Sequence, residues 1–368
     1  MKIAFLFKKD SHFKAVKSTA LRLCEQYKCE HTFIGIESEY LPNNEIYSIT
    51  YIGKEDLTSL CKYDYVVACL GGYLLNKVIS VLRDEDTKVI SIFPGIVSHY
   101  QLDAFISRLN SDQVWLNSES DFELYDAICK LFGYTNNSLL YGMSWLNSDV
   151  KLSKKHSILK HEEVIFFEQT EILSNIQRKR KFFNLLEKII LLNPHLKFKY
   201  KIRNNVTDNY FSKLRSRLNQ FENVEVVEDL TCVDISQATY YLSLSSSALV
   251  EGIAYGKRSY LMDKSLLDSD SREFYKNSNI EMKGFVLSNI SEPINSDWCR
   301  QRISLPLIYV DLFSCYKNKN HIFFEKRSFN IIRLMIFRLS SSYLKMFHLI
   351  FNEPRLKSIQ KSLEYLSI

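Results

Sequence analysis

No apolar run in the sequence reaches the roughly 18 uncharged residues that a membrane-spanning helix needs. The apolar run near the N-terminus, residues 2–7, is also too short for the core of a signal peptide. The eight cysteines form no Cys-x-x-Cys pair and have no His partner at zinc-binding spacing. These absences favour a protein of the cytoplasm whose thiols are buried and reduced.

Three functional motifs are also missing or inconspicuous. The sequence has no Gly-x-Gly-x-x-Gly fingerprint for a dinucleotide, no Asp-x-Asp metal motif stands out, and no recognised nucleic-acid-binding motif occurs. We therefore expect no bound cofactor, no essential metal ion and no nucleic-acid partner.

The chain is long enough for two domains. Its 368 residues, of which 46% are hydrophobic, can form two ordinary cores of about 150 residues each. A polar stretch at residues 147–162 interrupts the apolar periodicity and is expected to link them. We predict a first domain over residues 1–150, a second over residues 151–316 and a tail over residues 317–368.

Strands and helices alternate along the first half. Apolar, β-prone runs predict strands at residues 2–7, 31–36, 46–51, 64–70, 88–93 and 112–116. The stretches between them predict helices at residues 12–27, 55–61, 74–83, 100–109 and 119–132. This alternation is typical of a parallel sheet covered on both faces, in which ligands bind beyond the carboxyl ends of the strands.

Two residues in the loops at those ends can act as a general base. Asp10 follows the first strand, where its carboxylate can accept the proton of an attacking hydroxyl or can simply cap the next helix. His99 follows the turn at Pro94-Gly95, and an imidazole titrates near neutral pH, although a surface or capping role also fits its position. The remaining acceptor-side candidates are small residues in the same loops: Ser11, Gly71, Gly72 and Gly95. The Gly71-Gly72 pair either lets a backbone approach a ligand or forms a tight turn.

A second alternating set begins after the linker. It predicts a strand at residues 164–168, a long amphipathic helix at residues 174–192, and strands at residues 196–203 and 223–229. In the strand at 196–203, four basic residues share one face and cannot all lie in the core: Lys197, Lys199, Lys201 and Arg203. The first two can be solvated at a sheet edge, while the last two sit at the carboxyl end.

Residues 240–262 predict a strand, a hydroxyl-rich turn, a short helix and another strand. The turn is Ser245-Ser246-Ser247, and the helix over residues 248–255 is followed by Gly256. Serine caps and the helix dipole form a cradle that fits a phosphate or carboxylate, although the serines can also serve only as caps. Glu251 lies one helical turn further, where it can meet a pair of ribose hydroxyls. Gly252 inside the helix indicates that something approaches closely.

This segment resembles the donor-binding segment of GT-B glycosyltransferases, in which a Ser/Thr-rich turn precedes an acidic residue and a Gly-Lys ending. The segment is similar to that of bacterial surface-polysaccharide enzymes, especially those that use CMP-activated sialic acid or Kdo. The chain resembles a poorly characterised group of glycosyltransferases more strongly still, over most of residues 1 to 310. The resemblance implies two Rossmann-like domains that face each other across a cleft, with the acceptor mainly on the first and the nucleotide-sugar mainly on the second.

The same resemblance implies roles for three further residues. Lys201 and Arg203 stand where many sialyl- and Kdo-transferases have a His-Pro pair that neutralises the donor phosphate, and Arg suits a phosphate through its bidentate fork. This departure leaves the donor's identity open. Glu228 lies where a loop often packs against the nucleotide base, or it is a solvated strand end.

The tail carries the whole basic excess. Residues 317–368 contain ten Lys/Arg and three Asp/Glu, whereas the preceding 316 residues contain 38 Lys/Arg and 39 Asp/Glu. At about 100° per residue, an apolar arc faces a basic one. The apolar arc contains Ile332, Met335, Ile336 and Leu339, and the basic arc contains Arg327, Arg333, Arg338 and Lys345. This predicts a basic amphipathic helix that either packs on the protein or attaches it to an anionic membrane surface.

The sequence therefore favours a metal-independent glycosyltransferase at the inner face of the cytoplasmic membrane, acting on a glycan or lipid-linked acceptor. A nucleotide-sugar epimerase of the same twin-domain fold is one alternative, although it has little use for a membrane-binding tail. A non-catalytic protein of the membrane surface is the other.

Overall fold

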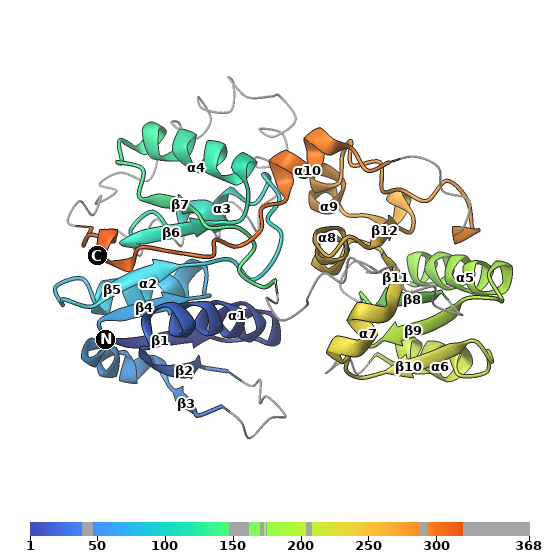
Figure 1. Ribbon diagram of the computed structural model, residues 1–368, viewed down its shortest axis with the longest axis horizontal. Coiled ribbons are helices and arrows are strands. Elements are labelled where there is room, and N and C mark those ends of the chain that lie inside the picture. The colour runs from blue at the N-terminus through green and yellow to red at the C-terminus, as the bar shows by residue number, and fades with distance from the viewer. Residues whose placement is uncertain are drawn as a thin grey trace. The chain divides into compact units, whose positions relative to one another are not determined.

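The computed structural model describes residues 1–38, 47–146, 162–169, 173, 175–203, 208–287 and 293–318. These residues form two compact α/β units, each built on its own sheet (Figure 1). The first unit contains Met1–Leu146 and the described residues from Arg300 onward, and the second lies within Asn147–Cys299.

The first domain has a seven-stranded parallel sheet in the order β3-β2-β1-β4-β5-β6-β7. Its strands are β1 (Lys2–Phe7), β2 (Glu30–Ile36), β3 (Ile49–Ile52), β4 (Tyr65–Ala68), β5 (Lys88–Ser91), β6 (Gln113–Leu116) and β7 (Ser138–Leu140). Its helices are α1 (Asp10–Tyr27), the 3-10 helix η1 (Lys54–Lys62), α2 (Gly72–Val81), α3 (Leu102–Ile106) and α4 (Glu119–Phe132).

The central strands of this sheet are buried on both faces. In β1, Ala4 and Leu6 belong to the core cluster formed with η1 and α2. Phe7 instead meets Phe13 of α1, with ring centroids 5.0 Å apart. Since successive side chains of a strand point to opposite faces, the continuous apolar run in β1 is what a strand between two helical layers requires.

The second domain has a five-stranded parallel sheet in the order β10-β9-β8-β11-β12. Its strands are β8 (Glu163–Phe167), β9 (Lys197–Lys201), β10 (Val224–Val227), β11 (Ala238–Ser243) and β12 (Arg258–Leu261). Its helices are α5 (Ile176–Leu192), α6 (Asn209–Leu218), α7 (Cys232–Gln237), α8 (Ser247–Ala254), the 3-10 helix η2 (Lys264–Leu266), α9 (Ser269–Phe274) and α10 (Ser296–Arg302), the last of which leads back to the first domain.

Each sheet has one point where the strand order reverses. In the first domain the chain moves outward from β1 through β2 to β3, then returns to β4 on the other side of β1. In the second domain it moves from β8 through β9 to β10 and returns to β11 beside β8. Ligands in open α/β sheets bind at such switch points, beyond the carboxyl ends of the two strands.

The structure confirms the predicted fold class of two Rossmann-like domains. The predicted cleft lies between the domains and stays a prediction. The short strand β7, which follows a polar stretch, was not predicted from the sequence. The stretch at 100–109 is helical only over Leu102–Ile106, and residues 54–62 form a 3-10 helix.

Two further sequence expectations differ from the structure. Residues up to 316 were assigned to the second domain, but residues 303–318 pack on the first (Figure 1). Strand β9 lies inside its sheet, so Lys199 is not at an edge; it pairs with Glu163 and with Asp234, whose pKa it lowers to about 2. Apart from Lys317 and Asn318, the predicted helical tail lies outside the described residues.

Candidate functional site

The switch point of the first domain brings together two of the predicted loops. The carboxyl ends of β1 and β4 are neighbours, with Leu6 paired to Ala68. Asp10 and Ser11 begin α1 beyond the first of these ends, and Gly71 and Gly72 begin α2 beyond the second. Gly72 has φ +52°, a conformation that favours glycine. Four of the six predicted acceptor-side residues therefore share one edge of the sheet.

His99 and Gly95 lie further along the same edge, beyond β5. His99 is in a turn rather than at a helix start, and its side chain is largely buried. Its Nε2 lies 3.4 Å from Oδ1 of Asp121, in the first turn of α4. The Gly95 carbonyl accepts a hydrogen bond from Asn117 Nδ2 at 3.1 Å. Strand β5 is two strands from β1, about 10 Å, so His99 and Asp10 follow different strand ends of this edge.

Arg108 is a residue of this site that the sequence analysis did not single out. Its side chain comes from the C-terminal end of α3 and donates to the carbonyls of Leu70 at 2.7 Å and Ile92 at 3.2 Å. Its guanidinium lies over the Phe93 ring at 3.9 Å and just under 4 Å from where a Cβ at Gly71 would be. No carboxylate of the described residues pairs with it, and burial lowers its pKa to about 10.

The electrostatic effect of this charge is visible at His12, in the first turn of α1. Burial lowers the His12 pKa to about 4, and the positive charges of Lys9, Arg108 and Lys8 act in the same direction. His12 is therefore a neutral imidazole at pH 7. The sequence could have indicated His12, because it lies two residues after Asp10. Nothing in the sequence distinguished Arg108 from an arginine on the surface of a helix.

The switch point of the second domain is organised by Gln169, which follows β8. Its Oε1 accepts from the Ser243 hydroxyl at 3.1 Å and from the Ser245 backbone N–H, and its Nε2 donates to the Ser245 hydroxyl at 3.3 Å. One amide thus joins the ends of β8 and β11. Gln169 was missed because its role depends on strand pairing rather than on a motif.

The three serines of the predicted cradle have different environments. Ser245 is buried and bonded to Gln169. Ser246 is the N-cap of α8 and accepts from Ala248 N at 3.2 Å, while its carbonyl accepts from the Tyr275 hydroxyl at 2.9 Å. Ser247 is half-buried at the first position of α8, and its hydroxyl makes no hydrogen bond within the described residues. Of the three hydroxyls, that of Ser247 is the one without a hydrogen bond among the described residues.

Glu251 and Gly252 lie on the buried side of α8. The charge of Glu251 adds to burial in raising the pKa of the Tyr241 phenol on β11. A Cβ at Gly252 would lie 2.4 Å from Ser259 Oγ and 2.6 Å from the Tyr241 ring. The group that approaches Gly252 is therefore the sheet, and contact between Glu251 and a ribose stays a prediction.

The basic pair at the end of β9 is divided by its contacts. Lys201 Nζ donates to the carbonyls of Ile202 and Glu228 and lies 3.8 Å from Asp229, so it ties the end of β9 to the end of β10. Arg203 is exposed at the end of the strand next to β8. The side chain of Glu228 is exposed one strand further from the switch point.

A buried carboxylate holds the Arg203 backbone in place. Glu168, immediately before Gln169, accepts from Arg203 N at 2.9 Å, from Tyr200 Oη at 3.0 Å and from Arg215 Nε at 3.1 Å. The carboxylate also raises the pKa of Arg215. The position of Arg203 near the switch point is therefore fixed from within the domain.

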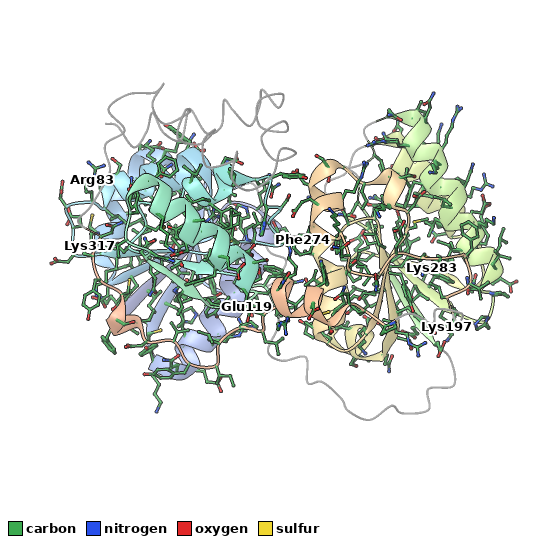
Figure 2. The ribbon with its side chains drawn as sticks, turned by 90° about the horizontal axis from the view of Figure 1, so that it is seen from above. Arg83, Glu119, Lys197, Phe274, Lys283 and Lys317 are labelled. Carbon is green, nitrogen blue, oxygen red and sulfur yellow. The ribbon has the colours of Figure 1, made fainter. Side chains whose placement is uncertain are left out.

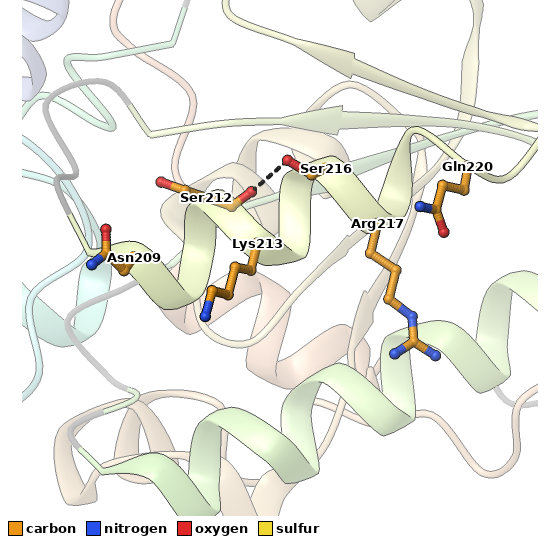
Figure 3. Close-up of a pocket in the computed structure, with 6 residues that line it drawn as sticks. All are labelled: Asn209, Ser212, Lys213, Ser216, Arg217 and Gln220. Carbon is orange, nitrogen blue, oxygen red and sulfur yellow. Dashed lines mark hydrogen bonds between the residues drawn. The ribbon is translucent and has the colours of Figure 1, made fainter.

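A surface pocket of about 350 Å³ lies elsewhere, along the outer face of α6 (Figure 3). Its lining residues are Asn209, Ser212, Lys213, Ser216, Arg217 and Gln220. None of them belongs to either switch point, so we do not place the substrate there. Within the described part of the chain, no three His, Cys, Asp or Glu residues are arranged to hold a metal ion, and no helix is long and apolar enough to cross a membrane.

Comparisons with known proteins agree with this architecture. A family model described as "Putative glycosyltransferase (DUF6716)" matches residues 32–280. No curated protein matches the sequence. Among solved structures, the chain is similar to UDP-GlcNAc 2-epimerase from Methanocaldococcus jannaschii in complex with UDP-GlcNAc and UDP, at 13% identity and a TM-score of 0.54, covering 78% of this chain and 90% of that one.

Two other solved structures show the same likeness. UDP-GlcNAc 2-epimerase from Neisseria meningitidis bound to UDP-GlcNAc has 11% identity and a TM-score of 0.54, with 78% of this chain and 89% of that chain covered. Os79 from O. sativa, in complex with U2F and trichothecene, has 12% identity and a TM-score of 0.50, with 77% and 86% covered. At these identities the likeness shows the shared fold.

Proposed function

Because the chain belongs to the glycosyltransferase family DUF6716, we propose that it transfers a sugar from a nucleotide-sugar donor to a glycan or lipid-linked acceptor. The observation that carries the proposal is the coincidence of candidate residues with topology. In both sheets, polar and glycine residues chosen from the sequence stand at the strand ends where the order reverses.

The second domain binds the donor in this proposal. Departure of the nucleotide leaves negative charge on its terminal phosphate, and groups that stabilise this charge lower the barrier. The N-terminus of α8 and the exposed Arg203 at the end of β9 supply such groups, together with the Ser247 hydroxyl, which has no hydrogen bond among the described residues. Lys201 contributes mainly by holding the ends of β9 and β10 together.

The first domain binds the acceptor. The attacking hydroxyl must lose a proton, and three groups at the carboxyl edge can take it: the exposed carboxylate of Asp10, the neutral imidazole of His12, and His99 beside Asp121. The buried charge of Arg108 also makes this edge a favourable place for an anionic substituent of the acceptor.

A more specific question is which nucleotide carries the donor sugar. The sequence resemblance favours CMP-activated sialic acid or Kdo, whereas two structural neighbours are complexes with UDP-GlcNAc, one of them also with UDP. A thermal-shift panel of CMP-, UDP- and GDP-sugars separates these, because a ligand that binds the folded state raises the melting temperature. We expect one nucleotide class to give the largest shift.

Release of free nucleotide, measured with and without acceptor glycans and in the presence of EDTA, tests the reaction. We expect release that depends on an acceptor and persists in EDTA. The structural neighbours favour a second candidate, epimerisation of the nucleotide-sugar. An epimerised sugar formed without any acceptor supports that candidate, and binding without turnover supports a non-catalytic role.

We further propose that residues 317–368 attach the protein to an anionic membrane surface, where a lipid-linked acceptor is found. The basis is the sequence's excess of ten Lys/Arg over three Asp/Glu in this segment. Co-sedimentation with anionic vesicles is expected for the full chain and is expected to weaken in a chain that ends before Lys317.

A further inference from the structure

The segment that returns to the first domain presents a row of large apolar side chains to solvent. We call residues 305–316 the apolar strap. Its exposed members are Leu305 (60% exposed), Leu307 (36%), Ile308 (96%), Tyr309 (66%), Phe313 (70%) and Tyr316 (79%). Single exposed apolar residues are ordinary on a protein surface, but six within twelve residues indicate an interaction site.

These side chains are exposed although the strap itself is well anchored. Leu307 N donates to the Tyr141 carbonyl at 2.8 Å, and Val310 exchanges hydrogen bonds with Gln26 at 2.7 and 3.1 Å. Tyr65 Oη donates to the Leu312 carbonyl at 3.0 Å. Three other side chains of the strap are buried, those of Val310, Leu312 and Cys315. Some apolar side chains of the strap therefore pack against the first domain, while others are exposed to solvent.

The backbone path of the strap is also fixed at its start. Gly142, with φ +92°, passes so close to the strap that a Cβ there would lie 2.2 Å from the Leu305 carbonyl oxygen. Only glycine allows this contact. The strap is thus a built part of the domain surface rather than a loose end.

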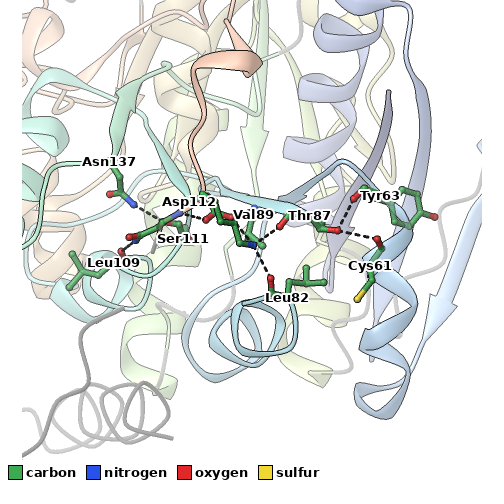
Figure 4. A network of polar contacts seen from close by, with 11 residues as sticks. Cys61, Tyr63, Leu82, Thr87, Val89, Leu109, Ser111, Asp112 and Asn137 are labelled. Atoms are coloured by element: carbon green, nitrogen blue, oxygen red, sulfur yellow. Dashed lines mark hydrogen bonds and ion pairs between the residues drawn. The ribbon is translucent and has the colours of Figure 1, made fainter. Parts of the chain in front are cut away.

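A polar network ends the strap and fixes where the basic tail begins (Figure 4). Lys317 Nζ donates to the carbonyls of Leu82 at 2.8 Å and Thr87 at 2.6 Å and lies 3.6 Å from Asp112. Asn318 N donates to Asp112 Oδ1 at 2.6 Å. Lys317 lies on the first domain (Figure 2), so the strap is held to this domain at both of its ends.

We propose that the apolar strap is a membrane-docking surface that inserts side chains into the interface of an anionic lipid bilayer. Two of its six exposed apolar residues are tyrosines, which suit the headgroup level because a ring and a hydroxyl meet different environments there. The adjoining residues from 317 on carry a net charge of +7, which complements anionic headgroups. Apolar insertion and electrostatic attraction together form the pair of signals that stable attachment requires.

The strap runs from one edge of the sheet to the other. Leu305 and Leu307 contact Gly142 and Tyr141 just after β7, at the carboxyl edge. The contacts of Val310, Leu312 and Lys317 are at the amino-end edge, with the end of α1, the start of β4 and the residues just before β5. The switch point between β1 and β4 is three strands from β7, so the strap does not contain its residues. This inference extends the proposed attachment of residues 317–368 and does not depend on sugar transfer.

Co-sedimentation of the full chain with phosphatidylglycerol and phosphatidylcholine vesicles tests the proposal. The double variant Ile308→Ser/Phe313→Ser removes two exposed strap residues without touching the buried ones. We expect its binding to phosphatidylglycerol vesicles to weaken at least tenfold. The matched control is Leu191→Ser/Leu192→Ser on α5, where the side chains are 61% and 46% exposed, and we expect it to bind as the unchanged chain does.

Three results would overturn the proposal. The strap variant binding as tightly as the unchanged chain would assign attachment to the tail alone. An equal loss in the α5 control would show nonspecific adhesion. A strap variant that binds vesicles normally but changes from dimer to monomer in light scattering would assign the strap to a second copy of the chain. Nucleotide release with a soluble acceptor is expected to be unchanged in both variants, so failure of the docking proposal and failure of the proposed reaction are separate outcomes.

Discussion

The two switch points are built from similar loops but differ in how their charges are compensated. In the second domain, Glu168 neutralises Arg215 and Gln169 satisfies the serine turn from within. In the first, Arg108 is buried against carbonyls and an aromatic ring and forms no ion pair among the described residues, although the nearby charge of Asp103 raises its pKa. The second site is preorganised by hydrogen bonds to a carboxylate and an amide, whereas the first holds a buried guanidinium through carbonyl groups. Loops at the same place in one fold can therefore be supported in different ways.

The largest effect is expected at the second switch point, where Glu168 neutralises Arg215. Glu168→Gln removes the carboxylate that Arg215 and the Arg203 backbone share, and leaving a buried charge without its partner costs about 3–5 kcal/mol. We expect the free energy of unfolding in urea to fall by that order. The control is Glu187→Gln, whose partner Arg217 is 55% exposed, and it should change stability by less than about 1 kcal/mol. Equal effects of the two changes would mean that Glu168 is not a central support.

The next prediction concerns the first switch point and the pH dependence of stability that His12 causes there. His12 has a pKa of about 4 in the folded protein, against 6.5 for an ordinary imidazole. Between these pH values only the unfolded chain binds a proton at His12, so protonation favours unfolding there. The free energy of unfolding is therefore unaffected by His12 above pH 6.5 and decreases as the pH falls from 6.5 to about 4. The loss is about 3 kcal/mol, at about 1.4 kcal/mol per pKa unit.

Unfolding curves at pH 7 and pH 4.5 measure this effect. We expect His12→Gln to lose less stability than the unchanged chain over this interval, while the exposed control His195→Gln follows the unchanged chain. Parallel curves for all three proteins would contradict the lowered His12 pKa, and with it the burial of His12 and its closeness to Lys9 and Arg108.

A smaller effect tests how the second switch point is packed. Gly252→Ala places a methyl group 2.4 Å from Ser259 Oγ and 2.6 Å from the Tyr241 ring, so α8 must shift from the sheet. Overpacking of this kind costs about 1–3 kcal/mol. Gly284→Ala, where nothing lies within 4 Å of the new Cβ, is the control and should leave urea unfolding unchanged. A neutral Gly252→Ala would mean that α8 is not packed tightly on the sheet at this position.

The smallest expected effect separates capping from binding in the serine turn. Ser246→Ala removes the N-cap of α8 and is expected to cost about 1 kcal/mol of stability. Ser247→Ala removes no hydrogen bond within the described residues and should leave stability unchanged, while weakening nucleotide binding about two- to tenfold. Calorimetric titration with the best nucleotide checks this. Unchanged binding in Ser247→Ala would show that the turn is only structural.

Local patterns predicted the elements of the structure well where burial and periodicity agree. The run at residues 2–7 is β1, and Ser118 with Gly133 bounds α4 as the capping rules expect. The expectations fell short where contact with a distant segment decides the outcome. Strand β7 exists because β6 pairs with it, and the assignment of residues 303–316 to the first domain depends on bonds to α1 and β4.

The candidate site divides in the same way. Asp10, Ser11, Gly71, Gly72 and the serine turn were found from the sequence, because strand ends followed by polar or glycine residues are a local signal. Arg108, Gln169 and Glu168 were not, because each acts through a partner at least 16 residues away in the chain. Lys201 was expected to meet a phosphate, but its ammonium lies on the end of β10.

By itself the sequence determined the alternation of strand and helix, the division into two α/β domains and the concentration of positive charge after residue 316. These properties depend on residue type and spacing, which act over one or two turns of chain. The tertiary structure alone decided which strand ends become neighbours, which charges are neutralised and which apolar side chains of the strap stay in water. Those outcomes depend on the order of strands in each sheet, because a parallel sheet brings together residues that are far apart along the chain.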